Sequence, residues 1–447
     1  MKRLLPLVTA ILVLVLGIIS CDNSAKAISW NDPNLETVIR EVIGKPLGDI
    51  HRSDLEGITT LIAQDKGIND IGPLKYCTNL TTLDLHGNQI SDISSLSKLT
   101  SLTSLGLGFN EISDVRPLSN LTYLDSLHLG WNHIDDFSPL SNLTNLTELV
   151  LYENRISNVS FLSNLTNLTR LDLTSNEISD ITPLSKLTGL TSLSLESNHQ
   201  ISDISALSNL TNLTSLSLMV NQVNDISPLS SLTNLTGLSL ESNKISDISP
   251  LANLTGLDWL DLTDNQISDF SLLSNLTNLT GVHLGYNQID DISFLSNLTN
   301  LTSLGLIVNQ ISDVSPLANL TNLTDLSLWD NQISDITPLS NLTKLTWLSL
   351  DENQISDFST LSDLTSLTHL SLAGNQISDI PFLASLTQLT KLYLVDNKIN
   401  DISPLVLNTG ISEGDEVNLE DNPLNTISLN EYIPQLEQRG VNVSWSR

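Results

Sequence analysis

The sequence predicts an α/β solenoid, a horseshoe of stacked coils with a parallel sheet on its concave face and short helical turns on its convex face. From Leu80 onward the chain repeats with a period of twenty-two residues, which is typical of solenoids. Apolar residues occupy unit positions 1, 4, 6, 11, 14, 17 and 20, and positions 4 to 6 alternate as a strand requires. Because no coil can bury its own leucine face, we expect the stacked coils to share one continuous core.

Residues 1–20 are predicted to form a lipoprotein signal peptide. Two basic residues precede a mainly apolar stretch, Leu4–Ile19, which is shorter than the roughly 20 residues that span a bilayer and is typical of secretory signals. It ends in "IISC", which resembles the lipobox of bacterial lipoproteins and implies cleavage before Cys21 and acylation of that cysteine. An ordinary signal with a chance cysteine and an uncleaved anchor are the alternatives. Residues 21–30 would be a short linker that holds the domain close to the membrane.

Residues 31–79 are expected to contain a helical N-terminal cap and a degenerate first repeat. The stretch "DPNLETVIREVIG" offers Asp32 as an N-cap, a proline in the first turn and Gly44 as the end of a helix. "SDLE" from Ser53 has the form of a capping box. Cys77 takes an apolar slot of the repeat, which predicts a small buried side chain with no disulfide. The apolar face of the helix would comprise Leu35, Val38, Ile39, Val42 and Ile43.

Residues 80–410 hold fifteen units of the repeat, and the unit that begins at Leu190 has one extra residue. Position 9 is Asn in every unit, from Asn88 to Asn397. It follows the strand, where backbone groups lack partners in the sheet, and its amide can bond to the backbone of its own and adjacent coils. Because a buried polar group without a partner costs about 1–3 kcal/mol, we interpret this row as structural.

Position 13 is Asp in fourteen of the fifteen units, with Asn158 as the exception. Ser or Thr at position 15 is expected to be an N-cap, and the proline that often follows it a first helical residue, which predicts a short helical turn on the convex side. A local turn role explains each Asp separately, and a calcium ladder along the row is the alternative. Residues 411–447 depart from the repeat and are expected to close the core as a C-terminal cap with a strand, a short helix and Trp445.

The unit core "LxxLxLxxNxI" resembles the leucine-rich repeat. The stretch "SDLEGITTLIAQDKGINDIGPLKYCTNLT", followed by "NQISDI-PL-NLT" units, is similar to the cap and repeats of the internalin family. Internalins are bacterial surface proteins whose concave repeat face binds host-cell proteins, so the resemblance implies a horseshoe displayed at a cell surface. It does not extend to an immunoglobulin-like domain or a sortase-type sorting signal, so binding to a host receptor does not follow from it.

Sequence diversity is concentrated at positions 3, 5, 7, 8 and 10, which flank the strand and face the concave side. Equal positions of neighbouring coils lie side by side, so bulky residues there would gather into exposed patches of the kind found at binding hot spots. Isolated exposed aromatics without a function are the alternative. The predicted ligand-binding residues are Tyr286, Ile307, Val308, Trp329 and Trp347, flanked by Asp325, Asp330, Asp351 and Glu352, and a second patch of Phe109, Trp131 and Tyr152.

Charge and motifs exclude several classes of function. A net charge of −31 argues against nucleic acid, whose phosphates require basic partners, and against adsorption to anionic lipid, so membrane contact is expected through the N-terminal lipid anchor only. Ser239, Asp261 and His283 share one row, but a catalytic triad needs His between Ser and Asp. His86 and His128 lie two coils apart, about 10 Å, which is too far to share a metal. We therefore expect no enzyme activity, no cofactor and no metal.

The leading hypothesis is a lipid-anchored cell-surface protein that binds a protein ligand through its concave face. A carbohydrate-binding or cell-wall-organising module is the alternative, because aromatic rings beside carboxylates also stack on sugars. A purely structural spacer is the third hypothesis.

Overall fold

The computed structural model describes residues 26–446, which contain one parallel sheet of eighteen short strands. Each strand pairs with the strand of the next coil, so residues one repeat apart lie in register, as Leu238 lies beside Leu260. The strands are β1 (Thr60–Ile62), β2 (Thr82–Asp84), β3 (Ser104–Gly106), β4 (Ser126–His128), β5 (Glu148–Val150), β6 (Arg170–Asp172), β7 (Ser192–Ser194), β8 (Ser215–Ser217), β9 (Gly237–Ser239), β10 (Trp259–Asp261), β11 (Gly281–His283), β12 (Ser303–Gly305), β13 (Asp325–Ser327), β14 (Trp347–Ser349), β15 (His369–Ser371), β16 (Lys391–Tyr393), β17 (Glu416–Asn418) and β18 (Asn442–Ser444).

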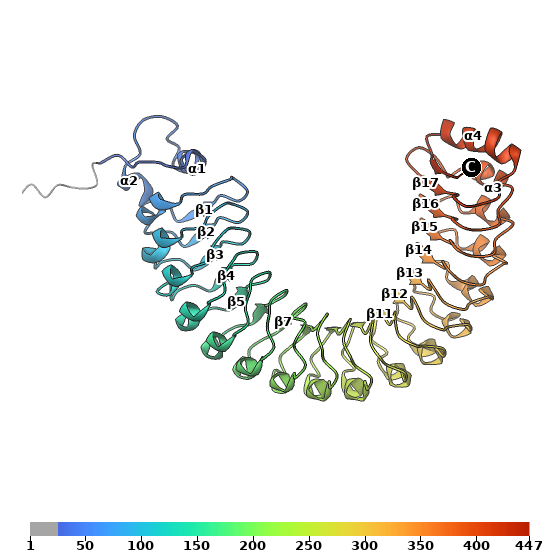
Figure 1. Cartoon of the computed structure of the whole chain (residues 1–447), viewed down its shortest axis with the longest axis horizontal. Coiled ribbons are helices and arrows are strands. Elements are labelled where there is room, and N and C mark those ends of the chain that lie inside the picture. Colours follow the sequence, from blue (N-terminus) through green and yellow to red (C-terminus); the bar gives the residue numbers. More distant parts are fainter. Residues whose placement is uncertain (1–25, 447) are drawn as a thin grey trace, which may run out of the picture.

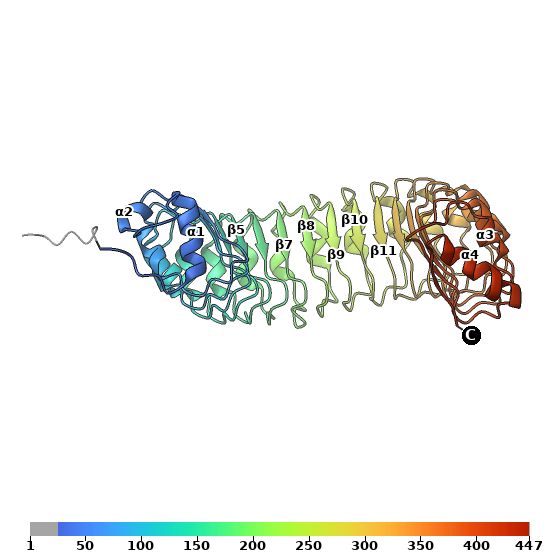
Figure 2. The same cartoon turned by 90° about the horizontal axis from the view of Figure 1, so that it is seen from above.

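The stack is curved into a horseshoe with the strands on its concave face and the helical turns on its convex face (Figure 1). Figure 2 shows the strands of the middle coils side by side along this band. A 3-10 turn lies between consecutive strands from η2 (Gly72–Tyr76) to η16 (Pro381–Ser385). The α/β solenoid predicted from the sequence is therefore confirmed, with its parallel sheet and its convex turns.

The core is a continuous series of leucine layers. In the coil that starts at Leu235, positions 1, 4 and 6 are Leu235, Leu238 and Leu240, and all three are fully buried. Burying one leucine stabilises the fold by about 1.5–3 kcal/mol, but each leucine needs the leucines of the neighbouring coils to exclude water. Cys77 is fully buried in the same core, as predicted, and burial raises the pKa of its thiol to about 12.

The asparagine row points inward and joins the coils, as predicted. Nδ2 of Asn243 donates to the carbonyls of Leu240 and Glu241 in its own coil, at 3.0 and 3.1 Å. It also donates to the carbonyl of Leu218 in the preceding coil at 2.9 Å, and Oδ1 accepts the amide of Val223 there at 3.0 Å. Each asparagine thus satisfies backbone groups that the strand leaves without partners.

The extra residue in the coil of Leu190 interrupts this row at one point. His199 adopts the left-handed conformation, with φ of 57°. In the neighbouring coil the amide of Ile178 donates to Oδ1 of Asn198 at 3.1 Å, and the same bond recurs along the stack. Within residues 26–446, however, Oδ1 of Asn221 is buried without a hydrogen-bond partner. The insertion therefore removes the acceptor half of one asparagine's bonding.

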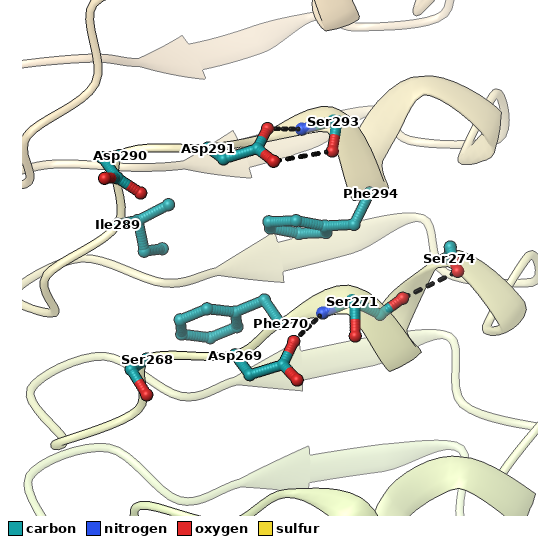
Figure 3. Close-up of a pocket in the computed structure, with 10 residues that line it drawn as sticks. All are labelled: Ser268, Asp269, Phe270, Ser271, Ser274, Ile289, Asp290, Asp291, Ser293 and Phe294. Atoms are coloured by element: carbon teal, nitrogen blue, oxygen red, sulfur yellow. Dashed lines mark hydrogen bonds between the residues drawn. The ribbon is translucent and has the colours of Figure 1, made fainter.

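The aspartate row caps the convex turns, which corrects one prediction. In Figure 3, Oδ1 of Asp291 accepts the amide of Ser293 at 2.8 Å and its Oδ2 accepts the hydroxyl at 3.0 Å. Asp269 accepts the amide of Ser271 at 2.9 Å, and hydrogen bonds from this serine lower the pKa of the Asp269 carboxyl. The capping side chain is the Asp at position 13, and the Ser or Thr at position 15, predicted to be the N-cap, is the first residue of the turn.

Stacked phenylalanine pairs join neighbouring coils beside these turns. A Phe at position 14 meets a Phe at position 16 of the next coil, and all of these rings are buried. The hollow of about 310 Å³ in Figure 3 is lined by one such pair and by the capping residues around it, so its walls are scaffold. The pairs are Phe137–Phe161, Phe270–Phe294 and Phe358–Phe382, with ring centroids 5.6, 5.7 and 6.0 Å apart.

The N-terminal cap is built on helix α1 (Pro33–Ile43). Asp32 is its N-cap and Gly44 ends it with φ of 64°, as predicted. Oδ2 of Asp32 also accepts the amides of Asn69 and Asp70, which joins the helix to the first coil. The apolar face is narrower than predicted, because Leu35, Val38 and Ile39 are buried whereas Val42 is 47 % exposed.

The capping box predicted at Ser53 is wrong. Helix α2 (Arg52–Leu55) begins before that residue, with His51 as its N-cap. The carboxylate of Asp54 accepts the amide of His51 at 2.7 Å and pairs with Lys45 at 2.8 Å. Asp54 therefore lies where a reciprocal cap needs a carboxylate, which moves the start of the helix ahead of the serine.

The C-terminal cap closes the core with two strands and a helical segment. β17 and β18 continue the sheet beyond the repeats, one strand more than expected. Helix α3 (Ser403–Leu407) lies in the last unit, and a π-helical turn, η17 (Ser428–Tyr432), leads into α4 (Ile433–Gln438). Ile433 and Leu436 of α4 are buried, and the partly buried Trp445 packs against the core, as predicted.

Candidate binding surface on the concave face

Position 8 of every repeat adopts the left-handed backbone conformation. At the thirteen non-glycine residues in this slot φ lies between 50° and 55°. Gly, Asn and Asp tolerate this conformation, whereas bulky side chains seldom adopt it. Most coils place a small or polar residue there, such as Gly87 or Ser175. Phe109, Trp131 and Tyr286 are the aromatic exceptions, and they are 40, 50 and 44 % exposed.

The three residues predicted for the N-terminal patch lie together on the coils of β3 to β5. The rings of Phe109 and Trp131 stack with centroids 5.3 Å apart and planes 8° from parallel. Tyr152 meets Phe109 edge-on at 6.2 Å. His86, which the sequence did not assign to this patch, adds a fourth ring 4.9 Å from Phe109. We call His86, Phe109, Trp131 and Tyr152 the N-terminal ring cluster.

Two glycines at position 7 make room for this cluster. A Cβ atom on Gly130 would lie 2.7 Å from the ring of Tyr152, and one on Gly108 would lie 2.9 Å from the ring of His86. The rings of one coil therefore lie over the glycine of its neighbour. The order His, Gly, Gly, Tyr at position 7 of four consecutive coils was the sequence signal that could have identified His86.

The five residues predicted for the C-terminal patch do not form a single cluster of rings. Ile307 lies over Gly285, and Ile307 and Trp347 line one hollow of about 220 Å³. Tyr286 and Val308 occupy the left-handed position 8. Trp329 is half-buried, and no ring pair within residues 26–446 includes it.

The hollow beside Trp347 is lined by apolar, polar and glycine residues, and we call it the C-terminal hollow. Gly305 and Trp347, which is 39 % exposed, line it. His283 and Asp325 supply polar groups to the same lining. Outside the hollow, Trp259 packs edge-on against His283 with centroids 4.6 Å apart. His283 and Trp259 lie in the variable concave positions but are not among the residues predicted for the C-terminal patch.

The acidic residues predicted to flank the C-terminal patch differ in whether hydrogen bonds within the chain engage their carboxylates. Asp351 accepts the amide of Ala373 at 2.7 Å and bonds to two serine hydroxyls, so its carboxylate is committed to the scaffold. Asp325 bonds to the hydroxyl of Thr324 at 2.6 Å. Asp330 and Glu352 are exposed at position 8. The carboxylates of Asp330 and Glu352, which follow the ends of their strands, are therefore the ones available to bind a partner.

The middle of the concave face is acidic. Burial raises the pKa of Glu241, and the neighbouring carboxylates of Asp261, Asp264 and Glu196 raise it further. A carboxylate in this setting favours cationic or hydrogen-bond-donating partners. The two ring-bearing regions thus lie on the two arms of the horseshoe (Figure 1), with an acidic stretch between them.

Three polar residues on neighbouring strands have the order of a catalytic triad. His283 lies between Asp261 and Ser303, with Nδ1 3.9 Å from the Asp261 carboxylate and Nε2 3.4 Å from the serine hydroxyl. The sequence pattern offers only Ser239, which pairs with Asp261 on the other side. The backbone of β12 pairs with both flanking strands, β11 and β13, in the sheet. We assign these residues no reaction.

Two predictions concern metals and membranes. Within residues 26–446, no group of three His, Cys, Asp or Glu residues is arranged to hold a metal ion, and each capping Asp has a local partner. The same part of the chain contains no helix of sufficient length and hydrophobicity to cross a bilayer. The predicted lipidation site, Cys21, lies outside the described residues.

Comparisons with known proteins agree with this architecture. No curated protein sequence matches the chain. InlF, an internalin of Listeria monocytogenes, is 37% identical, with 85% of this chain and 93% of that chain covered and a TM-score of 0.46. A leucine-rich repeat protein of Leptospira interrogans is 24% identical, with 88% and 97% covered and a TM-score of 0.70.

A plant receptor shares the fold at greater distance. The ectodomain of the Arabidopsis thaliana receptor kinase GASSHO1/SCHENGEN3, in complex with Casparian strip integrity factor 2, is 22% identical, with 88% of this chain and 59% of that chain covered and a TM-score of 0.59. The family described as "Leucine Rich repeats (2 copies)" matches residues 57–98, 144–186, 166–209, 211–253, 255–297, 299–341, 321–363, 343–385 and 365–407.

Proposed function

Because the chain belongs to the leucine-rich repeat family, whose stacked repeats form extended concave binding surfaces, we propose that it is a cell-surface protein that binds a protein ligand through its concave face. The proposed contact residues are Phe109, Trp131 and Tyr152 on one arm, and Tyr286, Ile307, Val308, Trp329 and Trp347 on the other. The proposed attachment to the membrane is acylation of Cys21.

The observation that carries the proposal is the choice of residues at position 8. A non-glycine residue in the left-handed conformation costs about 1–2 kcal/mol, and bulky side chains seldom adopt it. Phe109 and Trp131 adopt this conformation, and about half of the surface of each residue is exposed to solvent. A scaffold role would favour the glycine or aspartate found in other coils, whereas exposed, stacked rings are what a protein partner uses as anchors.

The test replaces one ring at this position. Trp131→Asn should weaken binding of the partner by about 2 kcal/mol or more, because asparagine tolerates the left-handed conformation but supplies no ring. Ser175→Asn is the matched control, since it makes the same residue in the same slot two coils further along the chain. A photo-crosslinking capture identifies the partner, and titration calorimetry then measures both variants. Equal affinities for the two variants would contradict the proposal.

The relatives support a protein ligand in general terms. The plant ectodomain was solved in complex with Casparian strip integrity factor 2, and the similar structures include an internalin. The acidic middle of the concave face favours a partner with basic groups there. Protein binding should therefore weaken with salt, and should involve residues on several coils.

A second candidate, sugar binding, is favoured by the C-terminal hollow. Trp347 can stack on the apolar face of a pyranose while His283 and Asp325 bond its hydroxyls, and the volume of about 220 Å³ suits one sugar ring. A glycan array with the native chain and Trp347→Ala separates the candidates. Binding of a single glycan class that this substitution abolishes would replace the protein-ligand proposal for this arm.

Lipid anchoring has its own test. Cys21→Ser should release the protein from membranes, because acyl chains on that sulfur and on the new amino terminus would hold it there. The sequence "IISC" supports the proposal. If the variant still fractionates with lipid, the segment is an uncleaved anchor.

A further inference from the structure

A pocket of about 470 Å³ lies at the N-terminal end of the solenoid, away from the strands. Its walls come from the chain segment 26–31, from Arg52 at the start of α2, and from the turn η2. Three cationic side chains, Lys26, Arg52 and Lys75, line it. All three are exposed.

This concentration of positive charge stands out in an acidic chain. Residues 26–79 carry six basic and eight acidic residues, a net charge of −2, whereas residues 80–447 carry eleven basic and forty-one acidic residues, a net charge of −30. An anion that approaches the repeats is repelled, so the N-terminal cap is the part of the chain that an anion can reach at low electrostatic cost.

Two of the cationic side chains lie beside the aromatic ring of Tyr76. The guanidinium of Arg52 lies 5.7 Å and the ammonium of Lys75 5.1 Å from the centroid of the Tyr76 ring, both within the range of cation–π attraction. The ring places two like charges side by side without neutralising either. Within residues 26–446, no ion pair involves Lys26 or Lys75.

The carboxylates near the pocket are already engaged. Asp70, which also lines it, accepts the amide of Gly72 at 2.7 Å and the side chain of Asn31 at 2.8 Å. Glu56 contacts Arg52 at 3.4 Å, and both side chains are about half exposed, a geometry that contributes little. The cations thus exceed the carboxylates that face them.

Two buried ring nitrogens adjoin the same walls. Nε1 of Trp30 and Nδ1 of His51 have no hydrogen-bond partner within the described residues. Their chain neighbours Ser29, Asn31 and Arg52 line the pocket. Neither Trp30 nor His51 itself lines the pocket.

We propose that this pocket binds a phosphate group, and that its occupant is the headgroup phosphate of an anionic lipid. Two lysines and an arginine beside an aromatic ring provide the charge and the directional donors that phosphate needs. The choice of a lipid rests on the anchor of the proposed function, whereas phosphate binding does not.

Covalent geometry brings the pocket close to the proposed anchor. Five residues lead from Cys21 to Lys26, and five residues span at most about 18 Å. An acylated Cys21 would therefore hold the pocket at the headgroup layer. The acidic repeats would be repelled by the same anionic surface, so headgroup binding would set the horseshoe with its cap towards the membrane.

The experiment tethers the chain chemically and does not depend on natural acylation. The chain from Cys21 onward contains the entire core, which extends from Leu35 to Val441. Its Cys21 thiol is coupled to a maleimide lipid, while the buried Cys77 is protected from the reagent. The vesicles contain phosphatidylcholine alone or with phosphatidylglycerol. Acylation of individual lysines by a water-soluble ester is followed by mass spectrometry.

We expect Lys26 and Lys75 to react about fivefold more slowly on vesicles with phosphatidylglycerol, the factor that one cation near an anionic surface supplies. Lys66, in the same cap but outside the pocket, should change less. Arg52→Gln should reduce the protection of Lys26 and Lys75, whereas the matched variant Lys66→Gln should leave it intact. Inorganic phosphate, added to vesicles of phosphatidylcholine alone, tests the free anion.

Each outcome decides the proposal. Protection by phosphatidylglycerol that requires Arg52 supports it. Protection by inorganic phosphate alone would overturn the lipid as occupant, and equal slowing of Lys66 or no slowing at all would overturn the pocket. Because the tether is chemical and no concave residue is involved, a failure here is distinct from a failure of the lipidation or ligand-binding proposals.

Discussion

Asn243→Ala measures what the inward asparagine contributes to the solenoid. The substitution removes four hydrogen bonds and leaves the amide of Val223 and carbonyls of two coils without these partners. The side chain is only 9% exposed, so water cannot replace it freely. One unsatisfied buried group costs about 1–3 kcal/mol, and we expect a loss of about 3 kcal/mol in the free energy of unfolding.

Two other asparagines provide internal references. Asn221 retains its three donated bonds, but its Oδ1 has no partner within the described residues, so Asn221→Ala should cost about 1 kcal/mol less. Asn234 is exposed and makes a single bond, to the carbonyl of Thr211 at 2.8 Å, so its replacement should cost about 0.5 kcal/mol.

Urea denaturation gives the three free energies, and hydrogen exchange gives the local effect. The amide of Val223 should lose its protection in Asn243→Ala and keep it in Asn234→Ala. If all three substitutions shift the denaturation midpoint equally, the number of bonds does not determine the effect, and the reasoning is refuted.

Three further predictions follow from the fold. Burial raises the pKa of the Asp32 carboxyl, but hydrogen bonds from four backbone amides lower it by more, so the net shift is downward. The ionised carboxylate should therefore stabilise the cap at neutral pH, and this stabilisation should be lost as the pH falls through the lowered pKa. Asp32→Asn should make unfolding of the cap, followed by circular dichroism, less dependent on pH in that acid range. Deletion of His199 should restore the missing bond to Asn221 and raise stability by about 1–3 kcal/mol, which a denaturation midpoint would check. A double-mutant cycle of Phe270→Leu and Phe294→Leu should give a coupling energy of about 0.5–1.5 kcal/mol, and additive losses would show that stacking contributes nothing.

The fold was predictable because the residue at each of these positions of the repeat has one physical role. Leucine at positions 1, 4 and 6 had to face inward, and Asn at position 9 had to satisfy the backbone beside it. The capping residue was harder, because Asp at position 13 and Ser at position 15 are both good N-caps. Only the coordinates show that the carboxylate of Asp291 accepts the amide of Ser293.

The candidate surface was predictable in part. Equal positions of adjacent coils lie side by side, so Phe109 and Trp131 were placed together correctly. Trp329 and Trp347 lie in adjacent coils but occupy positions 7 and 3. Trp347 is the first residue of β14, whereas Trp329 lies beyond the end of β13, and apolar character alone did not reveal this difference. The left-handed conformation at position 8 was not visible either, because a turn that tolerates Val308 and Tyr286 does not show the usual glycine signal.

The most direct test of the central claim compares two pairs of rings in one chain. The claim is that concave rings bind a partner and convex rings hold the coils together. We predict that Phe109→Asn with Trp131→Asn abolishes capture of the ligand and leaves the melting midpoint within a few degrees, because relief of backbone strain offsets the lost stacking. Phe137→Leu with Phe161→Leu should lower the midpoint and leave capture unchanged. A fall in the midpoint with capture intact for the concave pair would contradict the account.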